Sequence, residues 1–168
     1  APIFTRLLSP EDFGTVNVYN SWFQILLIVV SLNLFQGVFN VGMIKFEDNQ
    51  YKYMSCSQCI SILSTLIFFL IYILFSNFWN NIFQLPSILM IAMFVHILIY
   101  PSLQYWSGHQ RFSYKYRMLI FVTLLTSVLE PLLSIVAIKA SQYKAPAKIL
   151  SSVLVQGIIG IIFLVYIL

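Results

Sequence analysis

Glu130 is the only Asp, Glu, Lys or Arg placed well inside a long apolar stretch of this sequence. Four hydroxyl residues share its face at helical spacing: Thr123, Thr126, Ser127 and Ser134. An acid at the centre of a bilayer costs about 2.5–3.5 kcal/mol, so this stripe is expected to face the bundle interior or a wet cavity. Glu130 is therefore either a titrating group in a translocation cavity or a structural acid hydrogen-bonded between packed helices. Pro131 follows it and is expected to kink the helix.

His96 lies near the middle of another apolar stretch. Its depth in the membrane differs from that of Glu130 by only ~4–5 Å at 1.5 Å per residue. Depth alone therefore allows a His96–Glu130 pair. The alternative is a histidine packed and hydrogen-bonded among its apolar neighbours.

Two more apolar stretches carry polar side chains. The cavity candidates are Gln58, Ser61 and Thr65 in one stretch and Asn33, Gln36 and Asn40 in the other. The first group either lines a cavity or serves close helix packing, because small residues let two backbones approach. The stretch that carries Asn33, Gln36 and Asn40 also has Asn20 and Gln24 on its opposite face. We therefore expect this stretch to be surrounded by protein or cavity over much of its length.

No constellation of catalytic residues is evident. Cys56 and Cys59 spell C-x-x-C, but the sequence has no second pair and no neighbouring His. There is no nucleophile elbow, Gly-rich phosphate loop or metal cluster. We therefore expect no enzyme activity, no cofactor and no metal.

The elements that must hold these residues are membrane spans. The 168 residues are 60% hydrophobic and 8% charged, with a mean hydropathy of +0.90. Soluble domains are about 25% charged, which excludes a water-soluble enzyme, and long continuous apolar stretches exclude an outer-membrane barrel. A span needs about 20 apolar residues. The sequence predicts an all-α integral membrane protein with spans at about 18–43, 54–75, 85–105, 118–138 and 149–168.

The basic residues lie in short connections, which indicates contact with membrane lipids and not with nucleic acid. The second and fourth connections hold five of them: Lys45, Lys52, Arg111, Lys115 and Arg117. The other connections hold four: Arg6, Lys139, Lys144 and Lys148. By the positive-inside rule, this difference weakly predicts that the second and fourth connections are cytoplasmic.

The N-terminal segment has the strongest local signals. Ser9 is expected to cap a short interfacial helix, with Pro10 at its first position and Glu11 and Asp12 near its positive end. The string Thr5-Arg6-Leu7-Leu8-Ser9-Pro10-Glu11-Asp12-Phe13-Gly14 resembles the first connection of the Wzx-like polysaccharide-biosynthesis flippases, within the superfamily of multidrug and oligosaccharidyl-lipid exporters. The loop Lys45-Phe46-Glu47-Asp48 and the aromatic and basic segment 111–117 resemble later connections of that family.

The resemblance implies two facing bundles of about six helices. Residues 1–168 would be a fragment forming the N-terminal bundle, with its first helix truncated. It also implies a multi-pass protein of the bacterial inner membrane that flips an undecaprenyl-pyrophosphate-linked oligosaccharide by alternating access, with H⁺ or Na⁺ as a coupling ion. Arg6, Arg111 and Arg117 are candidates to meet the pyrophosphate or are topology signals only.

Other functions stay open from the sequence. One is a drug or small-cation exporter in which Glu130 binds a proton or cation. Others are a membrane-embedded glycan polymerase or acyltransferase with catalytic groups elsewhere in a longer chain, and a scaffold subunit.

Overall fold

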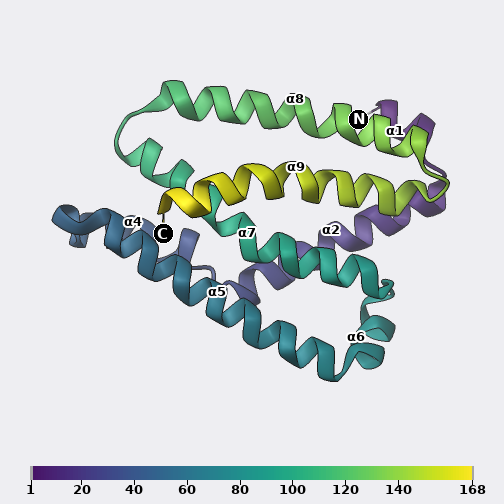
Figure 1. Cartoon of the computed structure of the whole chain (residues 1–168), viewed down its shortest axis with the longest axis horizontal. Helices are drawn as coiled ribbons and strands as arrows, with labels where there is room; N and C mark the ends of the chain where they lie inside the picture. The colour runs from purple at the N-terminus through teal and green to yellow at the C-terminus, as the bar shows by residue number, and fades with distance from the viewer. Residues whose placement is uncertain (1, 168) are drawn as a thin grey trace.

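Five helices long and apolar enough to cross a membrane make up most of the chain (Figure 1). They are α2 (Pro10–Val30), α5 (Gln50–Leu74), α7 (Ser87–Phe112), α8 (Tyr116–Ala140) and α9 (Lys144–Ile167). The computed structural model describes residues 2–167, and this range contains no β-strand. The predicted all-α membrane bundle with five spans is confirmed.

Shorter helices join or precede the spans. They are α1 (Pro2–Leu7), α3 (Leu34–Gly37), α4 (Phe39–Lys45), α6 (Ser76–Phe83) and a 3₁₀ turn at Glu47–Asn49. The expected truncated first span falls at α1, which has six residues and is too short to cross a bilayer.

The start of the first predicted span is wrong, because α2 begins at Pro10 and not near residue 18. The Ser9 hydroxyl accepts a hydrogen bond from the Asp12 backbone N–H at 3.1 Å, and the Asp12 carboxylate accepts one from the Ser9 backbone N–H at 3.3 Å. This capping box, with Pro10 at the first helical position, starts the helix where the sequence predicts a cap. The expected short interfacial helix is instead the first turn of the span itself.

The predicted span 18–43 is also wrong in its continuity, since α2 ends at Val30. The buried Ser31 hydroxyl donates to the Leu27 carbonyl at 2.5 Å. Leu32 and Asn33 then adopt left-handed φ values of 56° and 48°. Left-handed residues do not propagate a right-handed helix. The second half of the predicted span is therefore split off as α3 and α4.

Other parts of the chain also differ from the sequence prediction: α5 begins at Gln50 and α9 at Lys144, several residues before the predicted starts. The connection expected at 77–84 contains α6, and the third span continues to Phe112. The connection expected at 107–117 shrinks to a turn at residues 113–115. Pro131 does not interrupt α8. Pro146 lies in the first turn of α9, as predicted.

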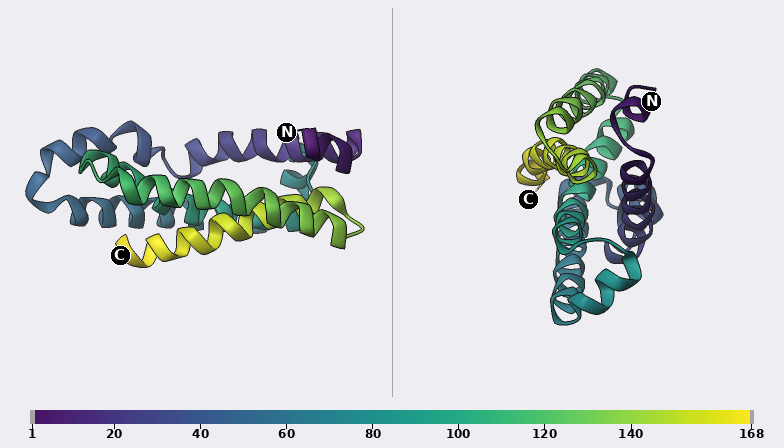
Figure 2. Two further views of the ribbon diagram at one scale, coloured as in Figure 1. Left: turned by 90° about the horizontal axis from the view of Figure 1, so that it is seen from above. Right: turned by 90° about the vertical axis from the view of Figure 1, so that its right-hand side faces the viewer.

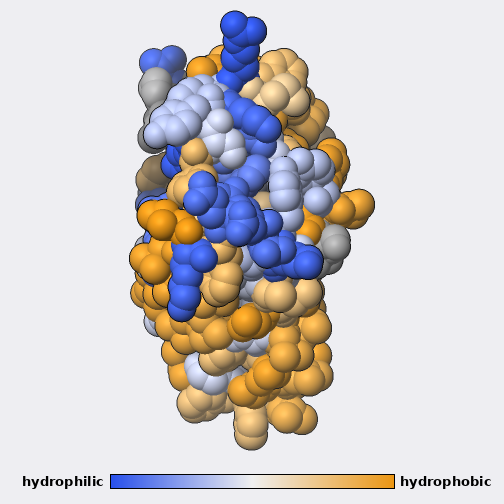
Figure 3. Space-filling view, turned by 90° about the vertical axis from the view of Figure 1, so that its left-hand side faces the viewer, coloured by the Kyte–Doolittle hydropathy of each residue, from blue (hydrophilic) through white to orange (hydrophobic). Residues whose placement is uncertain are grey.

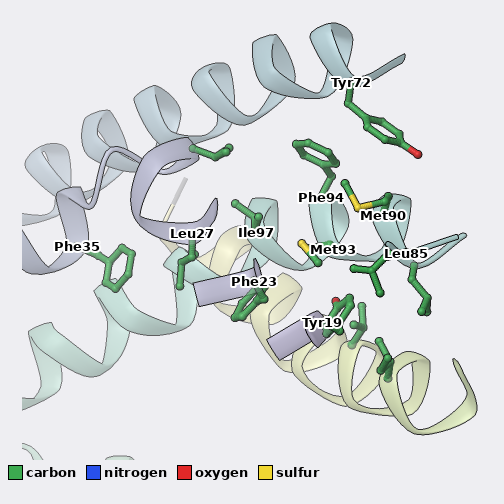
Figure 4. Packing of buried hydrophobic residues seen from close by; sticks show 14 of the residues in the cluster. Tyr19, Phe23, Leu27, Phe35, Tyr72, Leu85, Met90, Met93, Phe94 and Ile97 are labelled. Carbon is green, nitrogen blue, oxygen red and sulfur yellow. The ribbon is translucent and has the colours of Figure 1, made fainter. Parts of the chain in front are cut away.

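The core forms around α7, which packs against α2, α5 and α9. Apolar side chains from three of these helices interdigitate there, including Phe23 of α2, Tyr72 of α5, and Met93 and Ile97 of α7 (Figure 4). Packing of this kind fixes α7 firmly. The polar residues of α7 are thereby held at defined positions relative to α2 and α9.

Helices α7 and α9 approach each other closely at Gly160. A side chain at this position would overlap Ile99. The Ser102 hydroxyl donates to the Gly160 carbonyl at 2.8 Å. A small residue and an interhelical hydrogen bond together bring the two backbones close, as membrane helix packing requires.

Helix α8 lies at one margin of the bundle beside α9, as the end-on view shows (Figure 2, right). Most of its apolar side chains are exposed, including Phe121, Leu124 and Val128. Exposure of this kind suits a helix surrounded by lipid, because apolar side chains need no protein cover in hydrocarbon.

Candidate functional site

Side chains of four spans, α2, α7, α8 and α9, line a cleft of about 260 Å³, here called the Glu130 cleft. Its polar lining residues are Tyr19, Asn20, Gln24, His96, Tyr100, Glu130, Lys148, Ser152 and Gln156. Such a cleft within the membrane-spanning helices is the polar environment that the sequence predicts for an intramembrane acid. Glu130 and His96, the two candidates proposed to pair, both line it.

Gln156 of α9 lies between His96 and Glu130 and joins them. Its Nε2 donates to Glu130 Oε2 at 3.1 Å, and its Oε1 lies 2.7 Å from His96 Nε2. The proposed direct pair is therefore replaced by a hydrogen-bonded chain across α7, α9 and α8. A carboxylate only accepts hydrogen bonds, so the amide nitrogen must face Glu130 and the amide oxygen must face His96.

The direction of these hydrogen bonds determines which ring nitrogen of His96 carries the proton. Because Gln156 Oε1 is an acceptor, His96 Nε2 must carry the hydrogen. His96 Nδ1 is buried and has no hydrogen-bond partner within the described part of the chain. The ring stacks on Phe23 with centroids 4.2 Å apart and meets the edge of Tyr100 at 5.7 Å. These contacts favour a neutral imidazole protonated on Nε2.

Lys148 brings a positive charge to the same cleft from the first turns of α9. Its ammonium lies 4.8 Å from the centre of the Phe4 ring and 6.0 Å from that of Phe13. A cation over an aromatic face is stabilised by the ring quadrupole. The cleft therefore holds an acid, an amine and an imidazole within one partly open space.

A second cleft, of about 570 Å³, lies between α3, α4 and α7 and is here called the Arg111 cleft. Its polar lining residues are Gln36, Asn40, Gln104 and Arg111. Three aromatic rings complete it, those of Phe35, Phe39 and Phe112. Arg111 Nε donates to the Ser107 carbonyl at 3.3 Å, which anchors the side chain on its own helix.

A third cleft, of about 300 Å³, lies between α7 and α8. Gln104 and Arg111 line it as well, so it adjoins the Arg111 cleft. Thr123 and Thr126 line its α8 side and donate their hydroxyl hydrogens to carbonyls of the preceding turn. The N-terminal part of the predicted polar stripe on α8, with Thr123 and Thr126, therefore faces this third cleft.

Other predicted residues lie in helix interfaces. Gln58, Ser61 and Thr65 of α5 are almost completely buried, which supports the packing interpretation over the cavity interpretation. Ser61 donates to the Ser31 carbonyl at 3.3 Å, at the point where α2 ends. Ser134 is also buried, and its hydroxyl lies 3.0 Å from that of Ser151 of α9.

The remaining candidates lie outside the three clefts. Asn33 occupies the break after α2, and its buried Oδ1 has no hydrogen-bond partner. Ser127 is exposed on α8. Arg6 of α1 and Arg117 at the start of α8 are exposed. Helix α1 and the start of α8 lie at opposite ends of the bundle, which suits topology signals better than ligands in a common site (Figure 1).

The sequence analysis missed Gln156, Gln104 and Lys148 as site residues. A signal for Gln156 was present, because it is the only polar side chain between Ser152 and Tyr166 in an otherwise apolar and glycine stretch. Within residues 2–167 no three His, Cys, Asp or Glu residues come together in a group that could hold a metal ion.

Comparison of the chain with protein-family models, with curated proteins and with solved structures finds no match.

Proposed function

We propose that this chain forms one bundle of a membrane transporter that moves a lipid-linked oligosaccharide between leaflets, as the resemblance of residues 5–14 implies. The observation that carries the proposal is the set of three polar clefts in a bundle of membrane-spanning helices. Polar groups in hydrocarbon are costly and mark substrate or ion pathways. Amide, hydroxyl and charged side chains gathered in clefts are better explained by a polar cargo than by packing alone.

The chemistry of the Arg111 cleft suits the cargo. Gln36, Asn40 and Gln104 offer planar amides that donate to and accept from sugar hydroxyls. Arg111 supplies a guanidinium group, which binds phosphate oxygens in a bidentate manner. Aromatic rings at its wall offer apolar faces to the sugar ring. A polyprenyl tail would stay among the exposed apolar side chains that face lipid.

The surroundings of Glu130 favour a proton over Na⁺ as the coupling ion. Its hydrogen-bond partner is a nitrogen donor, Gln156 Nε2, and Lys148 lines the same cleft. A hard cation such as Na⁺ needs several oxygen ligands, whereas a proton needs only a carboxylate oxygen. We propose that Glu130 takes up and releases a proton during transport.

A second candidate is the export of a small organic cation. Glu130 lies in the same cleft as the aromatic rings of Phe23 and Tyr100. A carboxylate beside aromatic faces is the usual environment for a bound organic cation. The cleft volume of about 260 Å³ suits a small ligand better than an oligosaccharide.

The two candidates are separated by transport assays on the full chain in proteoliposomes. A fluorescent undecaprenyl-pyrophosphate oligosaccharide reports flipping, and a cationic dye reports export. Arg111→Gln is expected to slow flipping about tenfold or more, since a hydrogen bond to a charged group is worth about 1.5–3 kcal/mol. Its matched control, Arg117→Gln, removes an equal charge outside the clefts and should flip normally.

Glu130→Gln keeps the size and hydrogen bonding of the side chain but cannot be ionised. It should reduce flipping and flatten its pH dependence, whereas Glu47→Gln, an exposed acid outside the clefts, should do neither. Equal flipping by the Arg111 and Arg117 variants, with dye export lost in Glu130→Gln, would replace the first candidate by the second. An unchanged pH profile in Glu130→Gln would contradict proton coupling.

A further inference from the structure

The polar side chain of Gln156 is energetically unfavourable at its position in a membrane-spanning helix. It lies two turns or more from the ends of α9, among Val155, Gly157 and Ile158. Gln156 is half-buried, and a carboxamide withdrawn from water without partners destabilises a protein, so the side chain is favoured where both amide atoms are used. Both are used here, and by partners on two different helices.

The two partners need opposite hydrogen-bond polarity. Glu130, when ionised, can only accept, and His96 Nε2–H donates. The Gln156 amide satisfies both because it carries a donor at one end and an acceptor at the other. A hydrogen bond to a charged acceptor is about twice as strong as a neutral one and polarises the group that donates it. The charge on Glu130 therefore strengthens the hydrogen bond that Gln156 accepts from His96.

We infer that Gln156 is a positioning residue that transmits the protonation state of Glu130 to His96. When Glu130 binds a proton, the Gln156–Glu130 bond loses its charge, and Gln156 Oε1 becomes a weaker acceptor for His96 Nε2–H. His96 stacks on Phe23 of α2, so the change reaches the α2 wall of the cleft. In this step Glu130 binds one proton and forms one O–H bond, and no other covalent bond is made or broken. The inference deepens the proposed function, since it rests on Glu130 as the protonation site.

Other titratable groups line the same cleft. Lys148 comes from α9, Tyr19 from α2 and Tyr100 from α7, and α8 contributes only Glu130 to the lining. Asn20, Gln24 and Ser152 are uncharged. Among the described residues that line the cleft, Glu130 carries the only carboxyl group, and the His96 imidazole is the other group that protonates in the acid range. Glu130→Gln retains His96, so an acid response that is lost in this variant is assigned to Glu130.

The test is the NMR signal of the His96 Nε2–H group in the full chain, labelled with ¹⁵N-histidine and reconstituted in lipid. The chain has two histidines, and His109→Gln identifies the signal of the other one. In the unmodified chain the His96 Nε2–H proton should resonate downfield, as a hydrogen-bonded N–H does. It should move upfield as the pH is lowered. Glu130→Gln should fix it at the upfield position and abolish the acid response.

Gln156→Met removes both amide atoms and keeps the chain length. It should shift the His96 signal upfield at every pH and reduce the acid response to less than half. Ser152→Ala, one turn earlier on the same helix and in the same cleft, should leave both unchanged. An acid response that persists in full in Gln156→Met would show that Glu130 acts on His96 directly, and the inference would fall.

If Gln156→Met does not fold, Glu130→Gln still decides the question. It retains Gln156, and a His96 signal that stays at the downfield position in this variant, or that still responds to acid, would contradict transmission. The spectra are recorded without substrate, so they do not depend on what is transported. The expected His96 response, together with normal flipping and an unchanged pH profile in Glu130→Gln, would contradict proton coupling at Glu130 and leave the inference standing.

Discussion

Gln58 carries a complete carboxamide into the interior of the bundle, and neither of its amide atoms has a hydrogen-bond partner among the residues that the structure describes. It is fully buried on α5, in the same face as Ser61 and Thr65. Each of those two hydroxyls donates to a backbone carbonyl, so their polarity is satisfied. Gln58 is the member of this face whose polarity is not matched by its surroundings.

Replacement of Gln58 by Met should therefore stabilise the protein. Met has a similar length and no polar atom to desolvate, and an unsatisfied buried group costs about 1–3 kcal/mol. We expect the free energy of unfolding, measured in detergent, to rise by about 1 kcal/mol. The neighbouring Cys59 is exposed, so Cys59→Met should change it by less than about 0.5 kcal/mol. Destabilisation by Gln58→Met would indicate a partner for the amide and return Gln58 to the functional candidates.

The residues of the site show what a sequence can and cannot predict. Glu130 and His96 were identified because a charged or titratable residue in an apolar stretch is conspicuous, and both line one cleft. The sequence did not reveal their connection through Gln156, because this connection depends on how three helices pack and on which face of α9 turns inward. Periodicity gives the face of a single helix, whereas the meeting of two faces is a property of tertiary packing.

At the level of elements, the N-terminus of α2 is capped by interactions between residues close together in the sequence. The Ser9 hydroxyl donates to the Asp12 carboxylate at 2.7 Å in addition to the two bonds of the capping box. All three bonds lie at an exposed end of the helix and involve residues three apart. This is why the sequence predicts the cap correctly even though it misplaces the start of the span.

Ser9→Ala should destabilise the protein by about 0.5–2 kcal/mol, the usual effect of losing an N-cap side chain. The measurement is the midpoint of thermal unfolding in detergent. Thr15→Ala is the matched control, because the Thr15 hydroxyl donates to the Glu11 carbonyl within the same helix and caps nothing. Its effect should stay within about 0.5 kcal/mol. Equal losses for the two variants would show that the cap does not start α2.

The break between α2 and α3 has no comparable sequence signal. Glycine and proline are absent from residues 31–36, and the chain turns through left-handed conformations at Leu32 and Asn33. Asn adopts this region readily, but Leu does so at a cost of roughly 1–2 kcal/mol. The hydrophobic pattern therefore predicts one continuous span, and only the tertiary structure reveals two pieces.

Substitution at Leu32 tests the break. Leu32 is half exposed, so little packing is lost when it is replaced. Leu32→Gly should raise the free energy of unfolding by about 1 kcal/mol, because glycine accepts φ of 56° without strain. Leu32→Ile should lower it, since a β-branched side chain is least tolerated there. If the Leu32→Ile variant is more stable than the Leu32→Gly variant in thermal unfolding measurements, the span is a continuous helix. In that case glycine is destabilising because it lies in a helix interior.

At the scale of the whole molecule, polar and charged groups gather at one end of the bundle. The turn from α4 to α5 and the turn from α7 to α8 meet at this end (Figure 1). Hydrophilic residues cover much of its surface, next to the apolar sides of the helices (Figure 3). Exposed basic residues at this end include Lys45, Arg111, Lys115 and Arg117. The structure thus brings together the two connections that hold five of the nine basic residues.

The opposite end holds the start of α2, helix α6 and the turn from α8 to α9 (Figure 1). Lys144 there donates to the Leu7 carbonyl at 3.1 Å, and Lys148 lies over the rings of Phe4 and Phe13. Two of the basic residues at this end are therefore used in contacts that tie α1 and α2 to α9. Fewer basic side chains are therefore left to interact with anionic lipid at this end than at the other end. This contrast has the same direction as the count of five basic residues against four.

We predict from this distribution that the α7–α8 turn is cytoplasmic and the α8–α9 turn external. Tyr114 and Tyr143 form a matched pair of probes, since they are 79% and 75% exposed in these two turns. Each is replaced by Cys in a chain whose exposed Cys56 and Cys59 have been changed to Ser. In intact cells, a membrane-impermeant maleimide should label Tyr143→Cys and spare Tyr114→Cys. Permeabilised cells should label both, which controls for access. Labelling of Tyr114→Cys alone in intact cells would invert the orientation, and the Arg111 cleft would then belong to the external side.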